Sequence, residues 1–262
     1  MWEIAVVGTV EELSTNPSTL NLVRSQFETI FFSQVNFIKS TLPLLREKHT
    51  GHIIILTGIT GHIGTPGMPM YCASTWALEG FCDSLAYEIA PFNIKLTIVQ
   101  PNKEIPVLTN KIIFAPQLPQ YESSNNPAPG LRDILTNVVN MYPDTKISPA
   151  KSKNNIISRF PILPSEARDR LVMETVHALT AIGGHENPPA RHIVGYEGVA
   201  SVKEKLKTVS EELEDFVEVS CAVDIFKSDV GKAALAGGNG EDGNGSAAGS
   251  VGGSLPGPGS ST

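Results

Sequence analysis

The sequence predicts an open α/β fold with a parallel sheet. His52–Thr57 is apolar and β-branched at consecutive positions, which is typical of a strand covered on both faces, and Lys95–Val99 is predicted to be a second buried strand. A helix is predicted between them at Tyr71–Ala90, where Pro91 stops it. A strand, a helix and a second strand over this length make a βαβ unit, whose crossover is right-handed.

The elements on either side of this unit follow from apolar spacing. Upstream, Ser14–Glu47 repeats apolar residues at a spacing close to 3.6, which predicts a helix that Pro43 kinks or breaks near its end. Downstream, the loop-rich stretch Asn102–Pro164 precedes a helix at Ser165–Thr180. Arg191–Val194 is predicted to be a last short strand.

The final helix is predicted to open at Ser201, because Ser201 and Glu204 have the spacing of a capping box. Beyond it the composition changes, since residues 231–262 hold 11 of the 23 glycines. Such a segment cannot bury enough apolar surface to offset its conformational entropy. We therefore expect one domain at 1–228 and a disordered Gly/Ser-rich tail at 229–262.

Composition excludes several classes of function. Lys and Arg number 20 against 27 Asp and Glu, a net charge of −7 that argues against nucleic-acid and anionic-lipid partners. The three cysteines form no C-x-x-C pair and the six histidines have no metal-ligand spacing, so no metal site is expected. No apolar run reaches the ~20 residues of a membrane span, and the first residues do not resemble a signal peptide. We expect a cytoplasmic protein.

The segment Gly61–Phe81 carries a family signature. It reads GHIGTPGMPMYCASTWALEGF and closely resembles the active-site segment of the short-chain dehydrogenase/reductase family, in particular its hydroxysteroid-dehydrogenase-like and fungal members. Similarity extends to three preceding segments and one following strand, namely Val10–Ser14, Gln26–Thr29, Leu42–Arg46 and Ile94–Pro101. The resemblance covers most of residues 8–226. It implies a doubly wound, Rossmann-like sheet and hydride transfer between NAD(P) and a carbonyl or alcohol.

The resemblance also locates the catalytic positions. Members of the family use an Asn, a Ser, a Tyr and a Lys, and the tyrosine corresponds to Tyr71. The other three positions fall on Ile30, Gly58 and Thr75, so the asparagine, serine and lysine are replaced. A nearby ammonium normally stabilises the phenolate of the tyrosine. Without that charge, Tyr71 is expected to be a poor general base.

The cofactor site that the resemblance implies is also altered. No glycine-rich turn follows a first strand, and Met1–Glu3 stand where the family has an Asn-Asn-Ala-Gly segment. The family's Pro-Gly cofactor loop reads Pro101–Asn102, although Thr109 keeps a hydroxyl that would face NAD(P). We therefore expect a partial Rossmann-like parallel sheet that lacks the N-terminal dinucleotide-binding strands. The strand at His52–Thr57 would then lie at an open edge.

Three hypotheses of function follow. The first is a descendant of NAD(P)-dependent oxidoreductases that is catalytically impaired or inactive and serves as a binding or dimerising module. The second is an active short-chain dehydrogenase/reductase acting on a small lipophilic carbonyl or alcohol, and the third is an incomplete gene-model fragment. Family members commonly pack two helices against a second subunit, so the resemblance also implies a homodimer through residues 14–47 and 71–90.

Overall fold

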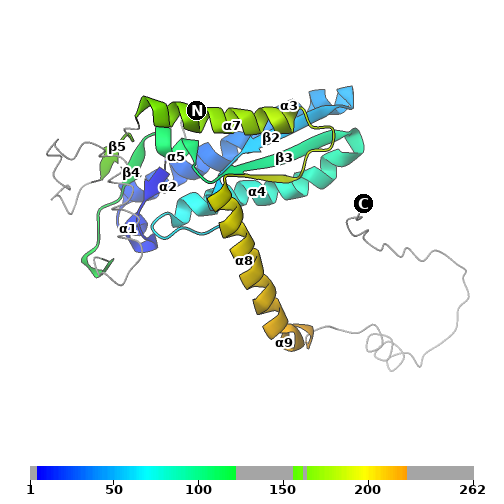
Figure 1. Ribbon diagram of the computed structural model, residues 1–262. Helices are drawn as coiled ribbons and strands as arrows, with labels where there is room; N and C mark the ends of the chain where they lie inside the picture. Colours follow the sequence, from blue (N-terminus) through cyan, green and yellow to red (C-terminus); the bar gives the residue numbers. More distant parts are fainter. Residues whose placement is uncertain (1–4, 122–155, 162–163, 223–262) are drawn as a thin grey trace, which may run out of the picture. The chain divides into compact units, whose positions relative to one another are not determined.

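The computed structural model describes residues 5–121, 156–161 and 164–222 (Figure 1). The chain divides into two compact units, Met1–Ser210 and Glu211–Thr262. Every contact described below lies within the first unit. The expected boundary between a domain and a tail at residue 229 lies outside the described residues.

A three-stranded parallel sheet forms the centre of the first unit. Its strands are β2 (Gly51–Leu56), β3 (Ile94–Pro101) and β6 (Arg191–Val194), in the order β2-β3-β6. Ile53 pairs with Leu96 and Ile98 pairs with Arg191. All three predicted strands are confirmed, and β2 has a single strand neighbour among the described residues, as expected of an edge.

A second small sheet was not predicted. It consists of β1 (Ala5–Val7), β4 (Ile112–Phe114) and β5 (Ile157–Arg159), with β4 in the middle. The β1–β4 pair is parallel and the β4–β5 pair antiparallel. Each strand has only three residues, which is too short for a periodic signal, so the stretch predicted as loop-rich contains two strands.

Helices cover both faces of the β2-β3-β6 sheet. α4 (Pro69–Ile89) packs on β3 and ends at a 3-10 turn that contains Pro91, which confirms the predicted stop. α7 (Ser165–Gly183) also agrees with its prediction and lies on the opposite face in Figure 1. The main apolar core, including Ile38, Ile55 and Leu85, lies between the sheet and the α4 side.

The predicted helix at Ser14–Glu47 is confirmed over most of its length. α2 (Pro17–Phe27), a π-helical turn (Glu28–Phe32) and α3 (Ser33–Lys48) follow one another without a break, and the short helix α1 (Val10–Ser14) precedes them. Pro43 lies inside α3 and does not end it. Pro43 is exposed, so water can satisfy the carbonyl group that loses its helical partner.

The predicted capping box at Ser201 is wrong. α8 (Tyr196–Asp215) begins five residues earlier, directly after Gly195, whose φ of +103° turns the chain out of β6. The remaining helices are short: α5 (Ile105–Thr109) and, in the second unit, α9 (Val217–Cys221). None of the described helices combines the length and apolar composition that a membrane span needs.

Candidate functional site

Tyr71 lies in the first turn of α4 with its side chain enclosed by apolar residues. The residue is 2% exposed and belongs to a cluster that includes Ile30, Met68, Val107 and Phe114. The structure therefore brings together the predicted tyrosine and asparagine positions, at Tyr71 and Ile30. The side chain of Ile30 is apolar, so it offers no hydrogen-bonding group of the kind that the family's asparagine has.

The hydroxyl of Tyr71 donates a hydrogen bond to a buried carboxyl group. Its acceptor is Oε2 of Glu104, at 2.9 Å. The other carboxyl oxygen, Oε1, accepts a hydrogen bond from the backbone N–H of Thr60, also at 2.9 Å. Glu104 follows β3 and is 6% exposed, and its backbone carbonyl accepts from the N–H groups of Val107 and Leu108 in α5. The end of β3 and the start of α5 thus place this side chain.

The carboxyl group of Glu104 occupies the space next to Gly58. A Cβ atom built on Gly58 would lie 2.1 Å from Cδ and 2.3 Å from Oε1 of Glu104. The backbone of Gly58 is extended, with φ near −171°, so its conformation does not require glycine. Glycine is needed here for space. The site that the family resemblance assigns to a serine is filled by an acid from another part of the chain.

Burial raises the pKa of Glu104 above its ordinary value of 4.5. The hydrogen bonds from Thr60 and Tyr71 favour the charged form, yet they do not outweigh the cost of desolvation. Glu104 therefore keeps its proton to a higher pH than an exposed glutamate. A carboxyl group also gives the phenol a hydrogen-bond acceptor in place of the cation that stabilises a phenolate.

Thr75 directs its hydroxyl toward its own helix. The hydroxyl donates to the backbone carbonyls of Cys72 at 2.9 Å and Tyr71 at 3.2 Å. It stands where the family's lysine would hold both the tyrosine and the cofactor ribose. With Tyr71 enclosed and Thr75 bound to α4, the residues described around Tyr71 do not fit a nicotinamide ribose.

The two residues assigned to cofactor contact lie in different elements. Pro101 ends β3 and lines a cavity on the α7 side of the sheet. Thr109 ends α5, is partly buried and is not among the residues that line that cavity.

A second buried acid, Glu79, lies two turns after Tyr71 on α4. Its carboxyl group accepts hydrogen bonds from Thr57 Oγ1 at 2.9 Å and from Gln100 Nε2 at 2.8 Å. Arg191 Nε lies 3.6 Å away. Burial raises the pKa of Glu79, and these neighbours lower it by less. The network fastens α4 to β3 and β6, which favours a structural role.

The described residues offer no group of three or more His, Cys, Asp or Glu side chains arranged to hold a metal ion.

Glu104 is the functional residue that sequence reasoning missed. It is the one acid in the stretch at the end of β3 that reads PNKEIPVL. The missing side chain at Gly58 was the second signal, because a buried strand end without a side chain needs another group to fill its space.

Part of the chain is similar to known proteins. The family model described as short chain dehydrogenase matches residues 4–107, which include Ile30, Gly58, Tyr71, Thr75 and Glu104. Human retinol dehydrogenase 8 is 30% identical over 122 residues, covering 47% of this chain and 38% of that protein. The 3-ketodihydrosphingosine reductase of Bacteroides thetaiotaomicron is 40% identical over 95 residues, covering 36% of this chain and 34% of that protein. The chain spans about a third of the length of the curated relatives it matches.

The solved structures show the same fold. A short-chain dehydrogenase from Streptomyces avermitilis superposes with a TM-score of 0.59 at 23% identity, over 86% of this chain and 70% of that one. This likeness confirms the predicted partial Rossmann-like fold. The family match covers most of the cluster around Tyr71, whereas Ile112 and Phe114 of that cluster lie beyond it. Over residues 4–107 the chain is similar to the short-chain dehydrogenase family.

Proposed function

We propose that this protein is a short-chain dehydrogenase relative that does not transfer hydride and serves as a binding or dimerising module. One observation carries the proposal: the carboxyl group of Glu104 fills the space beside Gly58 and accepts the hydrogen bond of Tyr71. In that position the carboxyl group occupies the site of the family's substrate-binding serine. It also accepts a hydrogen bond from the hydroxyl that would exchange a proton with substrate.

The chemistry of the remaining positions supports this proposal. Proton exchange at a carbonyl oxygen needs the tyrosine hydroxyl within hydrogen-bond reach of the substrate, about 2.6–3.2 Å. The Tyr71 hydroxyl is enclosed and bonded within the protein. Thr75 carries no charge, and Ile30 has no polar group to relay a proton. The protein therefore keeps the tyrosine of the family's site but not the side chains that would transfer a proton.

An active reductase is the second candidate. It is favoured by the retained Tyr71 and by the names of the relatives, a retinol dehydrogenase and a 3-ketodihydrosphingosine reductase. Both names point to lipophilic alcohols or ketones. For this candidate the protein would have to move Glu104 away from Tyr71 to admit a substrate.

The test is nucleotide binding and turnover by the full chain. NADH and NADPH are added at millimolar concentration, with all-trans-retinal or 3-ketodihydrosphingosine as substrate, and oxidation is followed at 340 nm. We expect no rise in the melting temperature with nucleotide and no oxidation above the rate without protein. Turnover that disappears in a Tyr71→Phe variant would establish the active reductase instead.

The proposed dimer is supported by exposed apolar side chains on the two helical regions that the family resemblance names. Phe37 is 67% exposed and Leu44 is 55% exposed, and they lie two turns apart on the same face of α3. Tyr87 on α4 is also largely exposed. We expect Phe37→Glu to shift the protein from dimer to monomer in light scattering after size exclusion. Val176→Glu, on the exposed face of α7, is the control and should leave the dimer intact.

A further inference from the structure

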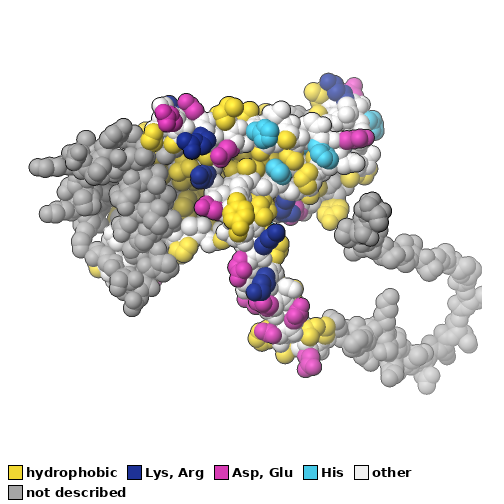
Figure 2. Space-filling view, viewed as in Figure 1, with side chains coloured by type: hydrophobic (Ala, Val, Ile, Leu, Met, Phe, Trp, Pro, Cys, Tyr) yellow, Lys and Arg dark blue, Asp and Glu magenta, His cyan; other side chains and the backbone are white. Residues whose placement is uncertain are grey.

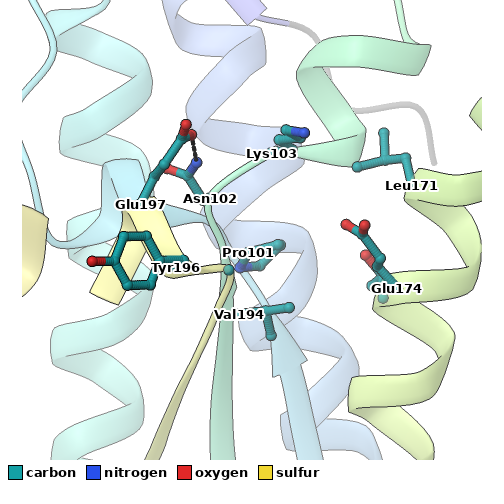
Figure 3. A pocket seen from close by; sticks show the side chains of 10 residues that line it. Pro101, Asn102, Lys103, Leu171, Glu174, Val194, Tyr196 and Glu197 are labelled. Atoms are coloured by element: carbon teal, nitrogen blue, oxygen red, sulfur yellow. Dashed lines mark hydrogen bonds between the residues drawn. The ribbon is translucent and has the colours of Figure 1, made fainter. Parts of the chain in front are cut away.

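A cavity of about 320 Å³ lies at the carboxyl ends of β3 and β6 (Figure 3). Its walls come from the end of β3, from one side of α7 and from the turn between β6 and α8. None of the residues at 30, 58, 71 and 75 lines it, so it is separate from the site around Tyr71. Crevices at the carboxyl ends of parallel strands are common ligand sites in α/β proteins.

The turn at one side of the cavity is held in place. The backbone N–H of Asn102 donates to the carbonyl of Val194, and its side-chain amide donates to Glu197, both at 2.9 Å. A Cβ atom on Gly198 would lie 3.1 Å from Cβ of Asn102, so the two segments are in close contact. Gly195 supplies the positive φ that the turn needs. The wall is formed before any ligand arrives.

Opposite charges flank the cavity without neutralising each other. Figure 3 shows the carboxyl group of Glu174, on α7, turned toward the space below Lys103. No ion pair joins these two side chains in the described part of the chain. The other acid at the rim, Glu197, is bonded to Asn102. On the face seen in Figure 2, side chains of both charge signs gather over α7 and toward the start of α8.

Part of the cavity wall is buried and apolar. Thr175 lines the cavity and is 3% exposed. Leu171 and Val194 supply apolar contact on two sides.

We propose that this cavity binds a small zwitterion of the amino-acid type with an apolar side chain. The carboxylate lies toward Lys103, the ammonium group toward Glu174, and the side chain against Leu171 and Val194. A simple anion would be repelled by Glu174, and a simple cation by Lys103. A molecule that carries both charges satisfies both residues, and the volume is at the lower end of the range for small-molecule sites.

The test uses the full chain and three probes: L-leucine, N-acetyl-L-leucine and L-leucinamide. The second probe lacks the ammonium group and the third lacks the carboxylate. Calorimetry should detect L-leucine and give affinities at least about tenfold weaker for both blocked probes, since each loses one charged contact worth at least about 1.4 kcal/mol. Lys103→Met and Glu174→Gln should each weaken the affinity for L-leucine by a similar factor. Lys203→Met and Glu166→Gln, at exposed positions that do not line the cavity, should leave its affinity unchanged.

Three outcomes would overturn the proposal. One is that L-leucine, L-isoleucine and L-methionine all fail to bind a chain that circular dichroism shows to be folded. Another is that the blocked probes bind as tightly as L-leucine, which would remove the role of the two charges. The third is that NADH displaces L-leucine while Glu174→Gln leaves L-leucine binding intact, which would assign the cavity to a nucleotide.

Discussion

Tyr71 and Glu104 are 33 residues apart in the sequence, yet the phenol hydroxyl donates to Oε2 of the carboxyl group at 2.9 Å. The contact joins the start of α4 to the segment that follows β3. It also depends on Gly58, whose missing side chain leaves room for the carboxyl group. These three residues act as one unit, so changes in them should not be independent.

The first prediction concerns Gly58→Ala. Its Cβ would approach Cδ of Glu104 to 2.1 Å, so the carboxyl group must leave its hydrogen bonds. Overpacking of this kind costs about 1–3 kcal/mol. Urea unfolding should report a loss in that range. Gly64→Ala is the matched control, because no atom lies within 4 Å of a Cβ there, and it should change stability by much less.

The same clash can be removed from the other side. Glu104→Ala alone leaves the Thr60 N–H and the Tyr71 hydroxyl without their acceptor, which costs about 1–3 kcal/mol. Combined with Gly58→Ala, it takes away the atom that the new methyl group would strike. The double variant should therefore be more stable than the sum of the two losses predicts. Additive losses would contradict the packing described here.

A second prediction follows from the raised pKa of Glu104. Between about 4.5 and that raised pKa, the folded protein keeps a proton that the unfolded chain releases. Stability then falls as pH rises through this window and is constant above it for this group. Glu104→Gln resembles the protonated acid and does not titrate. The unfolding free energy of Glu104→Gln, relative to that of the natural protein, should therefore increase as the pH rises from about 4.5.

The Glu104→Gln variant and the natural protein are compared by urea unfolding from pH 4 to pH 8. A Glu104→Gln stability curve that runs parallel to that of the natural protein would contradict the raised pKa of Glu104.

Sequence patterns predicted the long elements and missed features that depend on tertiary contact. β2, α4 and β3 are each six residues long or longer, so their residue patterns and Pro91 were enough to locate them. β1 is three residues long and becomes a strand through its pairing with β4, a segment more than a hundred residues away. Glu104 is similar, because its role depends on a space that only folding creates beside Gly58. Ser201 had the sequence of a cap, but the positive φ of Gly195 had already started the helix.

A third prediction concerns the Glu79 network. Glu79→Ala removes the acceptor for the Thr57 hydroxyl and for the Gln100 amide, both buried. Leaving buried donors unsatisfied costs about 1–3 kcal/mol each, so thermal unfolding should move to a clearly lower temperature. Glu88→Ala, on the same helix but exposed, should have little effect. Equal stability of the two variants would contradict a structural role for Glu79.

A fourth prediction concerns the contact between α8 and the loop after β2. The ammonium group of Lys205 lies 4.1 Å from the centre of the Trp76 ring and also donates to the carbonyl of His62. Lys205→Met should cost about 0.5–1 kcal/mol, the usual worth of an exposed cation–π contact, and should speed hydrogen exchange near His62. Lys203→Met keeps that contact and should exchange like the natural protein. If Lys205→Met and Lys203→Met have the same stability and the same hydrogen exchange, the contact does not contribute to stability.

The last prediction is that restoring the family's residues does not restore turnover. In Gly58→Ser the new side chain meets Glu104, and in Thr75→Lys an ammonium group enters a position that is 3% exposed. Burying an unpaired charge costs several kcal/mol, so the double variant should be strongly destabilised. Adding Glu104→Ala removes the clash and recovers part of that stability, while Ile30 still provides no proton relay. NADPH oxidation with all-trans-retinal should stay at the rate without protein in both variants. The opposite outcome is NADPH oxidation by the double variant that is lost when Tyr71→Phe is added. It would mean that Glu104 moves out of the site at little cost, and that the proposed loss of catalysis depends only on the residues at 58 and 75.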